Sequence, residues 1–95
     1  MVTKMTDAQG VIEARAKTHG DFPVQAGISQ ALKGSLRHSP SWDRLSPGQK
    51  ECCEMIAMKL SRIVSGSPNE PDHWTDIAGY ATLISNGLTK GTHLG

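Results

Sequence analysis

The chain has 95 residues and a nearly balanced charge, with ten Lys or Arg against nine Asp or Glu and a net charge of +1. This length allows one domain with one modest core, and the balance argues against a general nucleic-acid surface. No apolar run reaches the ~18–20 residues of a membrane span, and the first residues lack the apolar segment of a signal peptide, so we expect a cytoplasmic protein without membrane or nucleic-acid partners.

Helical periodicity runs through most of the chain, and no segment shows the alternation typical of a strand. A first helix is predicted over about 7–18. A second is predicted over about 22–37, with Asp21 as its N-cap and Pro23 in its first turn. Residues 39–45 are expected to form a loop whose large side chains fold back onto the core.

The third predicted helix has the clearest start signal in the chain. Ser46, Pro47 and Gln49 supply an N-cap, a proline at the first helical position and a capping-box partner. The helix should extend over about 47–64. Its predicted core stripe consists of Cys52, Cys53, Ile56, Leu60, Ile63 and Val64.

The fourth helix is predicted to begin at Asn69 or Glu70, with Pro71 in its first turn, and to end at Gly87. Gly79 is predicted to let another backbone approach closely. The predicted buried side consists of Trp74, Ile77, Ala81 and Ile84.

These elements predict an all-α fold, a compact bundle of about four helices. We expect a single domain over residues 1–95, with frayed ends at about 1–5 and 89–95. Because so short a chain gains core by association, a homo-oligomer is also expected.

Charged side chains border the apolar faces of the third and fourth helices. Lys59 and Arg62 suit a phosphate, since a guanidinium grips its oxygens bidentately. Asp72, Asp76 and Tyr80 share one face of the next helix, where they would meet the base or the ribose. We therefore predict a nucleotide site. Its residues are His19, Asp21, Lys59, Arg62, Asp72, Asp76 and Tyr80.

Structural roles are the alternative for the same side chains. The Lys and Arg could pair with the two Asp across the helices, and Tyr80 could belong to the core with its hydroxyl at the rim. A zinc site made by His73 with Asp72 and His19 is a weaker alternative.

Three blocks of the sequence resemble an uncharacterised family of small bacteriophage and prophage proteins: Lys-Thr-His-Gly-Asp-Phe at 17–22, and the segments 55–66 and 72–83. The resemblance covers most of residues 10–85, and the blocks occur in the family's order. In a phage protein, a nucleotide site that needs no metal implies sequestration of a nucleotide signal used by host defence.

The chain is more distantly similar to the all-α MazG-like nucleotide pyrophosphohydrolases, whose acidic helices hold magnesium against a nucleoside triphosphate. Those enzymes carry Glu-x-x-Glu on one helix and Glu-x-x-Asp on the next. Here Glu51 and Glu54 match the first half, whereas His73 stands three residues before Asp76 and the nearest acid is Asp72. The resemblance implies Glu51, Glu54, Asp72 and Asp76 as Mg²⁺ ligands if the protein hydrolyses its nucleotide.

The sequence does not decide whether the protein only binds a nucleotide or hydrolyses it. Binding needs no cofactor, whereas hydrolysis needs Mg²⁺. A second alternative is a helical interaction module that blocks a host protein, with Met55 and Met58 on its apolar surface and the charged side chains as its rim.

Overall fold

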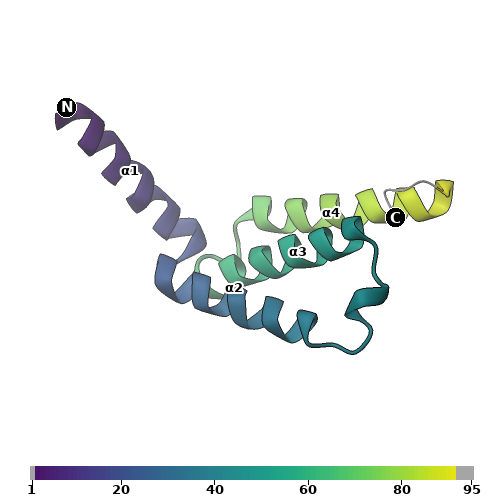
Figure 1. Cartoon of the computed structure of the whole chain (residues 1–95). Helices are drawn as coiled ribbons and strands as arrows, with labels where there is room; N and C mark the ends of the chain where they lie inside the picture. Colours follow the sequence, from purple (N-terminus) through teal and green to yellow (C-terminus); the bar gives the residue numbers. More distant parts are fainter. Residues whose placement is uncertain (1, 92–95) are drawn as a thin grey trace.

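The structure is a computed structural model that describes residues 2–91, with side chains described from residue 8 onward. Within this range it is entirely helical apart from turns, which confirms the all-α prediction (Figure 1). Its elements are α1 (Val2–His19), α2 (Phe22–Arg37), the short 3-10 helix η1 (Trp42–Arg44), α3 (Pro47–Ser65) and α4 (Pro71–Lys90). No helix in the described part of the chain is both long and apolar enough to cross a membrane.

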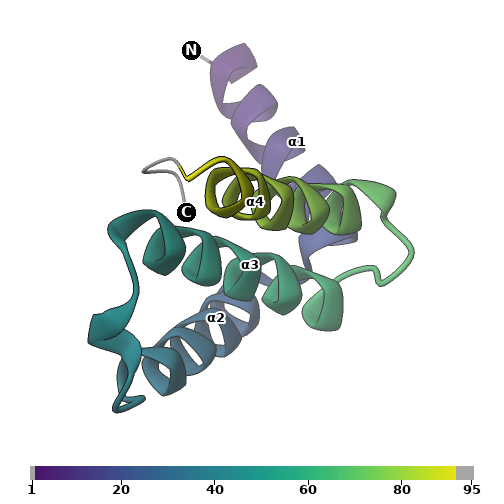
Figure 2. The same cartoon turned by 90° about the vertical axis from the view of Figure 1, so that its right-hand side faces the viewer.

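Helix α3 is the centre of the fold. It packs against α2, α4 and the end of α1, and the three helices α2, α3 and α4 lie side by side with alternating direction (Figures 1 and 2). Helix α1 instead projects away from the other three. The described side chains over 8–17 are all exposed, whereas Thr18, His19 and Gly20 are half-buried where α1 meets α3. The compact bundle therefore consists of α2, α3 and α4, and only the end of α1 packs against it.

Local signals fix the starts of α2, α3 and α4 where they were predicted. The Ser46 hydroxyl accepts from the Gln49 N–H at 3.1 Å and the Gln49 side chain accepts from the Ser46 N–H at 2.9 Å, so the capping box is complete. Asp21 and Glu70 occupy the N-cap positions of α2 and α4, each with a proline in the following turn, but neither side chain makes a capping hydrogen bond.

The first and the last helix are both longer than the sequence pattern predicts. Helix α1 begins at Val2, and α4 passes through Gly87, which is buried, to end at Gly91 in the left-handed conformation (φ 67°). The helices thus cover residues 2–5 and 89–90 of the ends expected to fray, while residues 1 and 92–95 lie outside the described range. The predicted loop over 39–45 contains η1, with Trp42 and Leu45 half-buried.

The apolar core of the described chain is small. Its buried apolar side chains are Cys52, Ala57 and Ile63, all on α3. The core prediction is wrong for Leu60 and Val64, which are 39% and 69% exposed. These two lie at the edge of the α3 stripe, where neighbouring helices leave them partly exposed.

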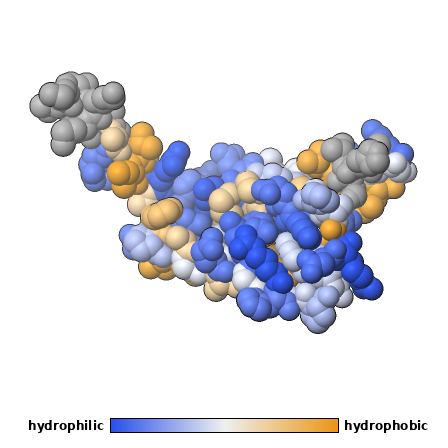
Figure 3. Space-filling view, in the orientation of Figure 1, coloured by the Kyte–Doolittle hydropathy of each residue, from blue (hydrophilic) through white to orange (hydrophobic). Residues whose placement is uncertain are grey.

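The buried side of α4 also differs from the prediction. Trp74 is 51% exposed and Ala81 is exposed, whereas the residue buried most completely on α4 is His73, at 2%. The Trp74 indole N–H reaches the Pro68 carbonyl at 2.8 Å, so the ring lies along the preceding turn. Apolar surface remains visible along α1 and near the end of α4 (Figure 3).

Candidate functional site

The turn between α1 and α2 packs against the end of α3. Gly20 has φ +82°, and a Cβ built on it would lie 2.0 Å from the Ser65 carbonyl oxygen. A Cβ on Gly66 would lie 2.2 Å from the Thr18 carbonyl oxygen. Two glycines therefore allow the backbones to touch, and this contact fixes the position of His19.

Hydrogen bonds hold the same contact. The Ser67 N–H donates to the Thr18 carbonyl at 3.0 Å, and the Ser65 hydroxyl lies 2.8 Å from the His19 carbonyl. His73 Nε2 lies 2.8 Å from the Thr18 carbonyl, 55 residues away in sequence. Since a carbonyl can only accept, Nε2 carries the proton and donates. His73 thus anchors α4 to the end of α1, and its ring lies 5.1 Å from that of His19.

Lys59 on α3 pairs with Asp76 on α4. The ammonium lies 2.7 Å from the carboxylate, and Lys59 is buried while the Asp76 side chain is 45% exposed. The hydrogen bond from Lys59 is the main reason why the pKa of Asp76 is lowered, with further contributions from the charges of Lys59, His73 and Arg62. The ion pair expected as the structural alternative is therefore present for these two residues.

Arg62, one turn further along α3, is in a different situation. Its Nε is buried and has no hydrogen-bond partner within the described residues. An unsatisfied buried donor costs about 1–3 kcal/mol, and the cost is higher for a charged group. This side chain therefore has unused capacity to bind an acceptor.

Two hollows meet at His19 and Arg62, each of about 390 Å³. Small-molecule sites have volumes of roughly 300–1,000 Å³. We call the first the mixed-charge hollow; it is lined by Thr18, His19, Lys59, Arg62, Glu70, Asp72, His73 and Asp76. We call the second the basic hollow; it is lined by Ile12, Arg15, Ala16, His19, Gly20, Asp21, Phe22, Pro23, Gln25 and Arg62.

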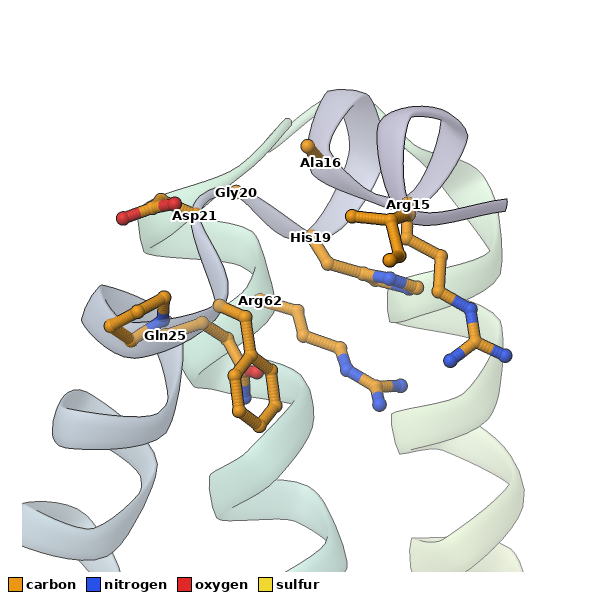
Figure 4. A pocket seen from close by; sticks show the side chains of 10 residues that line it. Arg15, Ala16, His19, Gly20, Asp21, Gln25 and Arg62 are labelled. Atoms are coloured by element: carbon orange, nitrogen blue, oxygen red, sulfur yellow. The ribbon is translucent and has the colours of Figure 1, made fainter. Parts of the chain in front are cut away.

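The basic hollow gathers cations from separate helices. In Figure 4 three side chains extend into the same space: Arg15 and His19 of α1, and Arg62 of α3. Asp21 points away from them. The pKa of His19 is lowered, first by burial and then by the positive charges of Arg62, His73, Lys59 and Arg15. The lowered pKa means that a positive charge on His19 is unfavourable, because the ring is partly buried and because other cations lie close to it.

The structure brings together five of the seven residues predicted to bind a nucleotide. His19, Lys59, Arg62, Asp72 and Asp76 all line the mixed-charge hollow. The other two lie apart from that group: Asp21 borders only the basic hollow, and Tyr80, further along α4, is half-buried and lines neither hollow.

The acids predicted to bind magnesium do not come together. Glu51 is exposed, and Glu54 is engaged by Arg37 of α2, whose Nε donates at 3.1 Å and whose hydrogen bond lowers the pKa of the carboxyl. Among the residues with described side chains, no three His, Cys, Asp or Glu lie close enough to hold a metal ion. The residues present do not fit the Mg²⁺ set that the MazG-like resemblance implies, nor do they form the zinc site considered for His73.

Several residues that line the two hollows were not predicted as site residues, among them the charged Arg15 and Glu70 and the aromatic Phe22. Phe22 ends the Lys-Thr-His-Gly-Asp-Phe block that resembles the phage family and is the only phenylalanine of the chain, so the sequence did point to it. Arg15 carried no signal, because it stands on a helix with little amphipathic pattern. Glu70 was recognised only as a helix start.

The comparisons with known proteins give one result. A family model described as a domain of unknown function (DUF6378) matches residues 3–87. No curated protein and no solved structure matches the chain.

Proposed function

Since the chain belongs to the DUF6378 family, a domain of unknown function, we propose its function from the site itself: it binds a nucleotide, with the phosphate at Arg62 and His19. The observation that carries the proposal is Arg62, which lines both hollows and whose buried Nε has no hydrogen-bond partner within the described residues. Phosphate oxygens are acceptors that match a guanidinium in shape and charge.

The mixed-charge hollow supports the choice of a nucleotide over a simple anion. Asp72 and Glu70 line it beside Arg62, and carboxylates accept hydrogen bonds from ribose hydroxyls or base N–H groups. Lys59 contributes less than the sequence suggested, because Asp76 already neutralises it at 2.7 Å. Arg62 is therefore the principal phosphate ligand in this proposal.

We propose holding rather than hydrolysis, because two of the four carboxylates that magnesium chemistry would need are already in ion pairs, Glu54 with Arg37 and Asp76 with Lys59. The phage origin, the host-defence role and the bacterial cytoplasm as location rest on the sequence alone and stay predictions, and so does the homo-oligomer, although its case also draws on the structure. A small domain with much exposed apolar surface gains core by association, which supports the last of these.

The test is a binding screen of the purified protein with ATP, GTP, CTP, UTP and cyclic di-GMP, by thermal shift and calorimetry, with and without Mg²⁺. At least one nucleotide should raise the melting temperature by mass action. Arg62→Ala should weaken its binding by about 10- to 150-fold, since hydrogen bonds to charged groups contribute about 1.5–3 kcal/mol. Arg44→Ala is the matched control, because Arg44 is an exposed arginine of η1 that lines neither hollow.

Each outcome decides between the alternatives. Binding of intact nucleotide with loss in Arg62→Ala alone supports the proposal. Release of pyrophosphate or phosphate that requires Mg²⁺ would replace it with the hydrolase. If no nucleotide raises the melting temperature, the nucleotide-binding proposal is wrong, and the interaction module remains as the alternative.

A further inference from the structure

The basic hollow differs chemically from its neighbour. It is the one of the two with apolar lining side chains, and these stand beside two arginines: Ile12, Ala16, Phe22 and Pro23 accompany Arg15 and Arg62. The mixed-charge hollow is lined by polar and charged residues throughout. A ligand that spans both would therefore need an apolar part, an anionic part and a part with hydrogen-bond donors.

Phe22 supplies a flat apolar surface at the edge of the basic hollow. It is the first residue of α2 and is followed by Pro23, so its backbone is fixed by the helix start, yet its side chain is 74% exposed. Scattered exposed apolar residues need no explanation. An aromatic ring at the rim of a cationic hollow is a more informative arrangement, because proteins that bind single-stranded nucleic acids combine aromatic side chains that stack on the bases with cations that hold the phosphates.

The cations are placed for the phosphate. Arg15 comes from α1 and Arg62 from α3, and Figure 4 shows both directed into the space beside His19. Asp21, the carboxylate that lines the basic hollow, is turned away from it. An anion between the two arginines would thus meet opposite charge from two helices at once.

We propose that the base of the bound nucleotide stacks on Phe22 in the basic hollow, that Arg15 and Arg62 hold its phosphate, and that its ribose faces the mixed-charge hollow. The inference rests on the proposed function and specifies which residues recognise which part of the ligand. It assigns the base to Phe22 in place of Tyr80, which lies outside both hollows.

The test compares two probes, one with a nucleoside and one that is the phosphate chain alone. Calorimetry with ATP and with inorganic triphosphate is performed on the full chain, on Phe22→Ala and on Arg15→Ala; if ATP is not bound, the tightest nucleotide of the screen replaces it. Phe22→Ala should weaken nucleotide binding by about 5- to 150-fold, the range of base–aromatic stacking, and leave triphosphate binding unchanged. Arg15→Ala should weaken both.

Matched controls lie close by on the same helices. Val24→Ala removes an exposed apolar side chain of α2 that is 54% exposed, and Lys17→Ala removes an exposed cation of α1; neither residue lines the two hollows. Both should bind like the wild type. Phe22→Trp should restore affinity, and the bound base should quench its fluorescence more than it quenches that of the wild type, which contains Trp42 and Trp74.

The outcomes separate the two proposals. If Arg62→Ala weakens binding and Phe22→Ala does not, the nucleotide site stands and the stacking inference is overturned. If Phe22→Ala weakens nucleotide and triphosphate equally, Phe22 shapes the site without contacting a base, and the inference also fails. If no nucleotide binds the wild type, both proposals fall.

Discussion

The close contact between the α1–α2 turn and the end of α3 makes Gly20→Ala a severe change. An L residue at φ +82° costs about 1–2 kcal/mol. The new Cβ would also lie 2.0 Å from the Ser65 carbonyl oxygen and 2.4 Å from its carbon, and overpacking of this kind costs about 1–3 kcal/mol. Together the two effects should lower the free energy of unfolding by about 2–5 kcal/mol.

Two further glycines separate these effects. Gly66→Ala places its Cβ 2.2 Å from the Thr18 carbonyl oxygen, with an overpacking cost of about 1–3 kcal/mol, and its φ is negative, so the cost of a left-handed residue does not apply. Gly79→Ala is the control. It lies inside α4 with nothing within 4 Å of an added Cβ, and replacing a glycine inside a helix should stabilise by roughly 0.5–1 kcal/mol.

Urea unfolding and thermal unfolding, both followed by circular dichroism at 222 nm, measure the stability of all three variants. For a domain of this size each kcal/mol corresponds to about 4–8 °C in melting temperature, so Gly20→Ala should melt roughly 10–40 °C lower. Stability of Gly20→Ala within about 0.5 kcal/mol of the wild type, a difference typical of neutral surface changes, would refute the contact. Destabilisation in Gly79→Ala would show that another chain packs on α4 there.

Two predictions concern pH. Asp76 has a folded pKa below its ordinary 3.8, so its stabilising contact with Lys59 is fully present above pH 3.8 and is lost as the pH falls through the folded value. Urea midpoints between pH 7 and pH 2 should therefore fall less steeply on acidification in Asp76→Asn than in the wild type; parallel profiles would contradict the ion pair. Bound phosphate should raise the lowered pKa of His19, so the complex takes up a proton and wild-type affinity for cyclic di-GMP or the best nucleotide should rise as the pH falls from about 8 to 6. His19→Gln should flatten this dependence, and an unchanged slope would exclude His19 from the phosphate site.

Short-range chemistry explains which parts of the fold could be predicted. The capping box of Ser46 and Gln49, and the prolines that follow Asp21 and Glu70, act within one helical turn, so the sequence alone places these starts. The end of α4 could not be placed equally well. Gly87 and Gly91 are both plausible stops, and only the second has the left-handed conformation that ends the helix.

Long-range contacts explain the rest. Gly79 looked like the position of close backbone approach because it lies among small residues, whereas the approach occurs at Gly20 and Gly66, two turn residues far apart in sequence. His73 bonds a carbonyl 55 residues away, and no sequence period encodes such a partner. Exposure of Leu60 likewise depends on which helices cover α3.

The fate of the two cations on α3 has the largest consequence for function. Lys59 and Arg62 are three residues apart and were predicted to act as a pair, but Asp76 takes up the first and leaves the second with an unpaired donor. A phosphate that needs two cations must then find its second one elsewhere, and Arg15 on α1 is the one that lines the same hollow. Bound ligand would thereby link the projecting helix to the bundle through charge, which the sequence pattern of α1 could not have suggested.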